Sequence, residues 1–347
     1  MKSATIIILL AIAVFAAVAF SGKSPDFEAP KQKLSDYGFF TGRLADLIPA
    51  KKVIPYDLNS ALFSNYAEKS RFIVLPEGEP AIYNPDSAFN MPVGTVLIKN
   101  FYFPADFRHP EKGRKILETR LLVHEPAGWN ALPYIWNKEQ TEAYYDVAGD
   151  TRQVQYTDSK GKKVNTSYVI PNKNQCKGCH SSGNRFLPIG ISARHLNKDF
   201  SYADGAENQL TFWKKHGLLN ELPEDKIPAN CNWQDESKPL EARARAYLDI
   251  NCGHCHNSAG PANTSGLFLD IHNKNETSLG IMKTPVAAGR GSGNLDYAIV
   301  PGRPDKSILL YRMNTTDPGI AMPEIGREQI HKEGIELISR WISSMKQ

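Results

Sequence analysis

A short cysteine–histidine motif that occurs twice constrains this chain of 347 residues more than any other feature. The copies read CKGCH over 176–180 and CGHCH over 252–256. In the pattern C-x-x-C-H, the two thiols are spaced to form thioethers with the two vinyl groups on one edge of a porphyrin, and the adjacent histidine lies under the iron. The sequence therefore predicts two covalent haems c. Their predicted attachment and proximal-ligand residues are Cys176, Cys179 and His180 for the first haem, and Cys252, Cys255 and His256 for the second.

Paired cysteines also bind zinc or form disulfides, so these two alternatives need weighing. A four-thiolate zinc site does not require histidine directly after each pair. With five cysteines and nine histidines in the chain, chance gives roughly one such motif per several hundred chains of this kind, so two copies favour haem. Cys231 is left over, and we interpret it as a free or buried thiol, with intermolecular pairing as the alternative. His254 lies inside the second motif, where it is too constrained to reach the same iron, and we expect it to be solvated.

The first residues predict export. Lys2 precedes an apolar run of 16 residues, Thr5 to Phe20, and Ala17 and Ala19 are small enough for a signal peptidase. An uncleaved anchor is the alternative, but the run falls short of the ~20 residues that span a bilayer. We therefore expect a cleaved signal peptide and a periplasmic or extracellular protein. No membrane span is expected in the mature chain.

Length and composition suggest several domains. The chain is too long for one haem module, and its net charge of +4 gives no reason to expect nucleic-acid binding. We expect a multidomain α+β protein, with a sandwich- or barrel-like β-rich domain followed by a mainly α-helical haem c region that ends in a class I cytochrome c-like module. The expected divisions are a signal peptide (1–21), a flexible lead-in (22–33), the β-rich domain (34–170), a first haem c segment (171–236), and a cytochrome c-like domain with the second haem (237–347).

Local patterns predict individual elements on both sides of Pro171. β-branched and aromatic residues predict four strands, two of which flank a hairpin turn over Asp158–Gly161. Periodic apolar residues and cap signals predict four helices after Pro171. The predicted strands are 95–103, 117–124, 152–156 and 164–170, and the predicted helices are 208–216, 237–250, 307–313 and 328–345.

Met322 is the predicted distal ligand of the second haem. It precedes Pro323 in a loop between the second motif and the last predicted helix, which is the order found in class I cytochromes c. A thioether ligand is soft, favours Fe(II) and raises the redox potential. The alternatives are core packing of Met322, or ligation by Met313 or Met282.

The first haem has no such methionine nearby, because none occurs between His180 and Met282. We consider His195 a possible distal ligand, since it follows His180 closely enough to fold over the same haem. The alternatives are a water molecule, an open sixth position, or a ligand from His216, His124 or Met91.

Strings beyond the motifs resemble a known family. The chain is similar to bacterial exported two-haem c-type cytochromes that have a long β-rich N-terminal half and a generally unassigned physiological role. The resemblance covers nearly all of the mature chain. It rests on strings such as VIPYDLNSALFSNYA from Val53, ETRLLVHEPAGW from Glu118, RARAYLDINCGHCH from Arg243 and PGRPDKSILLYRM from Pro301. It implies haem at both motifs and electron transfer as the default activity.

The expected function is therefore one-electron transfer to a redox protein partner, with the oligomeric state left open. One alternative is an oxidoreductase of peroxidase type, in which an open first haem reacts while the second haem supplies electrons. Another is a structural or sensory haem protein whose β-rich domain binds a partner. Trp129, Tyr134 and Trp136 would then line a ligand face, although core packing explains them more simply.

Overall fold

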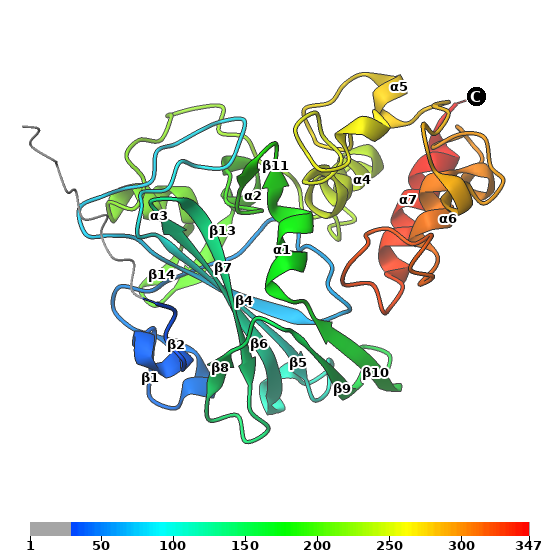
Figure 1. Ribbon diagram of the computed structural model, residues 1–347. Coiled ribbons are helices and arrows are strands. Elements are labelled where there is room, and N and C mark those ends of the chain that lie inside the picture. Colours follow the sequence, from blue (N-terminus) through cyan, green and yellow to red (C-terminus); the bar gives the residue numbers. More distant parts are fainter. Residues whose placement is uncertain (1–28, 347) are drawn as a thin grey trace, which may run out of the picture.

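The computed structural model describes residues 29–346. The predicted signal peptide and residues 22–28 of the lead-in lie outside the described residues. The centre of the molecule is a six-stranded antiparallel sheet in which every strand pairs with its neighbours in sequence (Figure 1). Short connections suffice for such a meander. Its strands are β3 (Ile54–Tyr56), β4 (Glu68–Val74), β5 (Val96–Pro104), β6 (Arg114–Glu125), β7 (Gly128–Trp136) and β8 (Ala143–Tyr145).

One face of this sheet packs against the N-terminal segment. Ile98, Leu121 and Tyr134 are fully buried on this face and belong to one apolar cluster with Leu34 and Phe39. Trp136 is in the same cluster, so Tyr134 and Trp136 pack in the core. The covering segment contains η1 (Leu34–Tyr37), β1 (Phe40–Thr41), η2 (Leu44–Asp46) and β2 (Ile48–Pro49).

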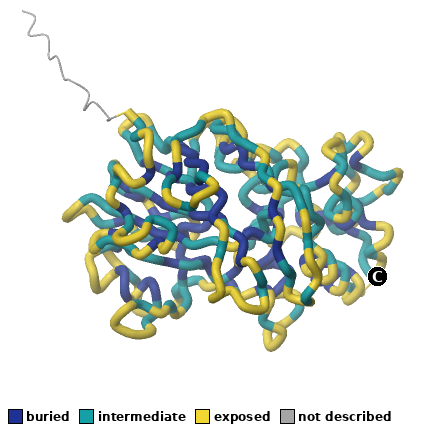
Figure 2. The backbone as a smooth tube through the Cα atoms, turned by 90° about the horizontal axis from the view of Figure 1, so that it is seen from below, coloured by how far each residue is buried: buried dark blue, intermediate teal, exposed yellow. Residues whose placement is uncertain are grey.

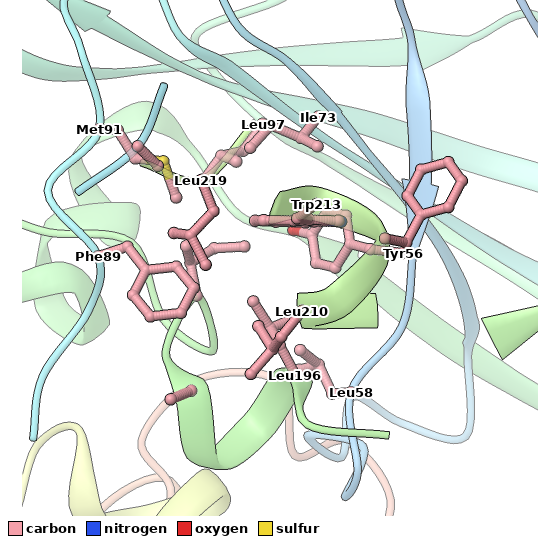
Figure 3. Packing of buried hydrophobic residues seen from close by; sticks show 14 of the residues in the cluster. Tyr56, Leu58, Ile73, Phe89, Met91, Leu97, Leu196, Leu210, Trp213 and Leu219 are labelled. Atoms are coloured by element: carbon pink, nitrogen blue, oxygen red, sulfur yellow. The ribbon is translucent and has the colours of Figure 1, made fainter. Parts of the chain in front are cut away.

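The opposite face carries two separate apolar clusters. Leu97 belongs to a cluster around Trp213, which packs in close contact with Leu210 and Leu219 (Figure 3). Phe101, four residues further along β5, belongs to another cluster, which the hairpin of β9 (Asp150–Thr157) and β10 (Lys163–Ile170) covers. Side chains at alternate positions share a face, so the position between Leu97 and Phe101 also belongs to this face.

The chain after Pro171 is built from short elements joined by long irregular segments. The α-helices are α1 (Lys173–His180), α2 (Ala193–Leu196), α3 (Gln209–Lys215), α4 (Leu240–Leu248), α5 (Glu276–Leu279), α6 (Ile308–Met313) and α7 (Lys332–Ser344). Two small hairpins pair β11 (Ser181–Ser182) with β12 (Arg185–Phe186) and β13 (Asp199–Tyr202) with β14 (Gly205–Asn208). Helices α4 to α7 lie to one side of the sheet (Figure 1).

The expectation of a mainly α-helical haem region, ending in a class I cytochrome c-like module, is wrong. Helix accounts for 24% and strand for 27% of the structure, and the two hairpins lie within the region expected to be helical. Glycines in left-handed conformations break the chain between α4 and α6. Gly280 (φ 110°) ends α5, and Gly293 (φ 60°) lies against Tyr311, where a Cβ would come within 2.5 Å of the ring. Only glycine adopts such backbone without cost.

The expected sandwich or barrel is also corrected. Within residues 29–346, the end strands β3 and β8 do not pair with each other, so the meander stays open. Irregular segments and a separate hairpin cover the faces of the meander, where a sandwich would have a second large sheet. Figure 2 shows buried stretches running through the interior and exposed loops around the rim.

The predictions of individual elements are confirmed. The four predicted strands correspond to β5, β6, β9 and β10, and the Asp158–Gly161 turn joins the last two. The four predicted helices correspond to α3, α4, α6 and α7, although α4 begins later than predicted, after Pro239. Among the described residues, no helix is both long and apolar enough to span a membrane.

Candidate functional site

Helix α1 positions the first motif. Asn172 caps the helix: its side chain accepts a hydrogen bond from the Gln175 backbone N–H at 2.9 Å, and the Gln175 side chain accepts one from the Asn172 backbone N–H at 2.8 Å. This reciprocal capping box fixes where the helix starts. The helix packs against β7 and presents Cys176, Cys179 and His180 to a cavity.

Helix α4 and one wide π-helical turn (Asp249–Gly253) position the second motif. Asp249 anchors this turn, because its buried carboxylate accepts hydrogen bonds from Arg194 Nε at 2.8 Å and from Asn230 Nδ2 at 2.8 Å. Gly253, inside the motif, lies so close to Asp270 that a Cβ would come within 2.9 Å of its Cα. The turn therefore holds the second motif firmly against its surroundings.

The two motifs, far apart in the sequence, line the same cavity of about 420 Å³. Its walls combine the sheet, α1, the second motif and the loop before α7. Cys179 Sγ, Cys255 Sγ and a ring nitrogen of His254 all lie within 4.8 Å of one another. His254 is half-buried in this group rather than fully solvated.

The two motif histidines are held in the neutral form. Burial lowers the pKa of His180 to about 4, and burial likewise lowers the pKa of His256 to about 4. His180 Nδ1 donates to the Leu187 carbonyl at 2.8 Å, and its ring stacks on Phe186. Because Nδ1 carries the proton, the lone pair on Nε2 is free. An imidazole that binds a metal has this form.

The four motif cysteines carry free thiols. Burial raises the pKa of Cys252 to about 12 and also raises the pKa of Cys176. A hydrogen bond from the Cys255 thiol lowers the pKa of Cys179. Thiols with raised pKa values are poor nucleophiles at neutral pH, whereas the lowered pKa makes Cys179 the most reactive thiol of the group.

These residues fit haem c. Both thiol pairs are free for thioether bonds, His180 has an available Nε2, and the buried His256 Nδ1 has no hydrogen-bond partner among residues 29–346. The cavity falls in the range of 300–1,000 Å³ typical of cofactor sites. The same cavity also explains why buried, unpartnered ring nitrogens persist at the second motif.

Two of the three methionines considered as distal ligands reach the cavity. Met322 and Met313 both line it. Met282 is 49% exposed and is not among the lining residues. The structure thus brings Met322 and the second motif into the same cavity and keeps Met313 as its rival.

None of the named candidates for the first distal position lines the cavity. His195 is buried in α2, with Nε2 3.3 Å from Asp249 Oδ2. His124 stacks on Trp129 and hydrogen bonds with its Nδ1 to the Met91 carbonyl. His216 stacks on Phe212 at the end of α3. Met91 packs in the core beside Leu219 (Figure 3).

Sequence reasoning missed several charged or titratable cavity residues, among them Lys99, Arg120 and His331. A lysine inside the apolar strand string VLIKNFYF was an available signal, because a charge on a buried face needs a reason. His331 stacks on Phe63 with ring centroids 4.0 Å apart and hydrogen bonds through Nδ1 to the Tyr247 hydroxyl. No pattern in the sequence connects it with residues so distant.

Cys231 lies apart from the cavity. Its thiol is free and half-buried, and its carbonyl accepts a hydrogen bond from Ser60 Oγ at 2.8 Å. This agrees with a thiol that has no partner among the described residues.

Comparison with known proteins adds no relative: no family model, no curated protein and no solved structure matches this chain. The interpretation of the cavity therefore rests on the residues that line it.

Proposed function

We propose that the chain is an exported dihaem c-type cytochrome that transfers single electrons between its two haems and a redox protein partner. The observation that carries the proposal is that both C-x-x-C-H motifs line one cavity, with Cys179 Sγ and Cys255 Sγ within 4.8 Å of each other. Two thioether attachment points this close favour a function that couples two haems over one that uses them separately.

The residues have simple roles in this function. Cys176, Cys179, Cys252 and Cys255 attach the haems, and His180 and His256 bind the irons through neutral imidazoles. Met322 completes the second site. Haem supplies reversible one-electron Fe(III)/Fe(II) chemistry, while the protein sets each potential through axial ligands, burial and nearby charge.

The proposal includes export and docking. The apolar run over 5–20 fits a cleaved export signal. Such a signal would direct the protein to the periplasm or outside the cell. The sheet shields one side of the cavity. A redox partner would approach where the cavity reaches the surface.

A haem count tests the proposal. The purified full chain, produced with the haem c maturation machinery, should keep its colour after acid–acetone extraction and give two haems c per chain in a pyridine haemochrome assay. Double Cys→Ser variants of each motif should each lose one haem. Bound zinc in stoichiometric amount, held by Cys179, His254 and Cys255, or a Cys179–Cys255 disulfide in place of haem, would refute it.

A haem enzyme of peroxidase type is the second candidate. The observation that favours it is that His195, His216, His124 and Met91 all lie outside the cavity lining, which leaves the first iron without any of its considered ligands. An iron with an open sixth position binds small oxidants.

The spin state of the first haem separates the two candidates. A high-spin ferric signal from one haem, with cyanide binding and turnover of peroxide, would support the enzyme. Two low-spin haems that do not bind cyanide would support an electron carrier.

A further inference from the structure

A row of positive charge crosses the sheet face that lines the cavity. In the register of β4, β5 and β6, Arg71 lies directly opposite Lys99, and Lys99 lies directly opposite Arg120. Lys99 Nζ and Arg120 Cζ both lie over the ring of Phe101, 5.0 Å and 4.3 Å from its centroid. Like charges directly opposite on neighbouring strands destabilise a sheet, so the row requires a compensating partner.

Within residues 29–346, acidic side chains neutralise only part of the positive charge of this row. Arg71 pairs with Asp57 at 2.7 Å, and Arg120 pairs with Glu118 at 2.6 Å. Glu118 is already shared, because the Tyr168 hydroxyl donates to it at 2.7 Å. Across residues 29–346, the half-buried Lys99 ammonium forms no hydrogen bond or ion pair. The buried Arg71 Nη2 has no hydrogen-bond partner either. Burying an unpaired charge is costly.

The uncompensated charge faces the cavity that the first motif also lines. Lys99 and Arg120 line the cavity together with Cys176 and His180. The charge of Lys99 acts on the His180 imidazole, and that of Arg120 acts on the Cys176 thiol. Burial and the neighbouring cations lower the pKa of Lys99 well below its ordinary value, which is the response expected of a lysine that lacks an anion.

We propose that Lys99 and Arg120, backed by Arg71, bind the two propionate carboxylates of the haem attached at the first motif. This inference rests on the proposed function. Haem c carries two carboxylates as its acidic groups, and they lie on the porphyrin edge away from the thioethers. A guanidinium and an ammonium on adjacent strands provide charge-assisted donors for such a pair. The sheet therefore supplies the positive charge that balances the two propionates of the first haem.

The test uses Lys99→Gln and Arg120→Gln in the holoprotein, with Lys115→Gln, an exposed lysine on β6, as the matched control. The first haem has no thioether ligand, so it should titrate as the lower-potential of two waves and the second haem as the upper wave. Removing a cation from the propionates stabilises Fe(III), so the lower wave should move down by at least tenfold in its redox equilibrium, or about 59 mV for one electron. Resonance Raman propionate bending bands should shift with it. The upper wave and the Lys115→Gln protein should stay near wild type.

Other outcomes overturn the proposal. An unchanged lower wave, a shift confined to the upper wave, or a Lys99→Arg protein that shifts as far as Lys99→Gln would each contradict it. Titration with inorganic phosphate tests a further alternative. If phosphate shifts the lower wave of the wild type saturably but does not shift that of Lys99→Gln, the row of positive charge binds a free anion instead of the propionates. A wild-type protein without haem would instead refute the proposed function itself, and the haemochrome assay detects this separately.

Discussion

At the scale of single residues, the two methionines of the cavity are the candidates for the axial ligand of the proposed second haem. Met322 and Met313 both line the cavity, whereas Met282 does not. Met313 also packs against the cluster that includes Leu310 on α6, so its side chain already has a structural role. Met322 lies in a loop and is half-buried like Met313, but it belongs to none of the apolar clusters formed by residues 29–346. The thioether with fewer packing contacts is the better candidate for an axial ligand.

Met322→Ala should therefore abolish the near-infrared charge-transfer band of Fe(III)–S(Met) and lower the potential of the upper wave, because thioether ligation favours Fe(II). Absorption spectroscopy of the oxidised protein and a redox titration measure the two effects. Met313→Ala and Met282→Ala are the controls and should keep the band. If the band survives in Met322→Ala and disappears in Met313→Ala, the ligand is Met313.

His195 illustrates a residue whose environment argues for structure over ligation. Burial lowers its pKa to about 4, against the opposing effect of Asp249, so it is neutral at pH 7. The unfolded chain, with an ordinary pKa of 6.5, binds more protons between these two values. Its contribution to stability is thus fully present above pH 6.5 and is lost as the pH falls toward 4, by up to about 3 kcal/mol.

His195→Gln should remove this dependence. The difference in unfolding free energy between wild type and variant, measured by urea denaturation at pH 7 and at pH 4.5, should shift by about 2–3 kcal/mol in favour of the variant at the lower pH. The visible spectrum should not change. Conversion of one haem to high spin in His195→Gln would instead show that His195 is the distal ligand considered from the sequence.

At the scale of elements, the sequence predicted those strands and helices that have a regular spacing of apolar residues. The strands β5 and β6 and the helices α4 and α7 carry regular apolar patterns over eight or more residues, and each was found in place. The hairpin β11–β12, with two-residue strands, and the irregular segment over 34–53 carry no period that a sequence pattern can reveal. Their form depends on partners distant in the chain, such as the sheet face that contacts Leu34.

The same limit applies to the site. The attachment residues could be predicted from the sequence, and remain a prediction, because five adjacent positions specify the chemistry. Lys99 and Arg120 belong to the cavity only because the register of β5 and β6 places them opposite each other. His331 belongs to it because α7 packs against α4. Such placements need the register and the packing, which a single sequence does not provide.

Helix α7 should be essential to the C-terminal part. Trp341 is 1% exposed, packs in a cluster with Leu248 of α4, and donates from its indole N–H to Glu241. Trp341→Ala should cost about 3–5 kcal/mol through the cavity it leaves, measured by urea denaturation of the holoprotein. Ser343→Ala, at an exposed position of α7, should change stability by less than about 0.5 kcal/mol. A loss below about 1 kcal/mol in Trp341→Ala would mean that α7 is peripheral.

At the scale of the whole molecule, the cavity gathers segments from the full length of the described chain. The sheet, with Lys99 and Arg120, supplies one wall, α1 supplies the first motif, the turn after α4 supplies the second, and the loop before α7 supplies Met322. The buried pairing of His195 and Arg194 with Asp249 ties the segment after the first motif to the turn that carries the second. The fold thus fixes the two motifs against one another, as the proposed coupling between haems would require.

This closeness predicts a magnetic signature. With Cys179 Sγ and Cys255 Sγ within 4.8 Å, the two ferric haems of the oxidised protein should interact, because dipolar coupling between unpaired electrons falls with the cube of their separation. The oxidised EPR spectrum should then be broader than the sum of two isolated haems. Reduction of the upper wave alone should sharpen the remaining ferric signal. The variant Cys252→Ser/Cys255→Ser, which lacks the second haem, should give the same sharp signal without any reduction. Oxidised and half-reduced spectra with equally sharp lines would show that the two haems extend away from each other, and that rapid transfer between them is not the reason the motifs share a cavity.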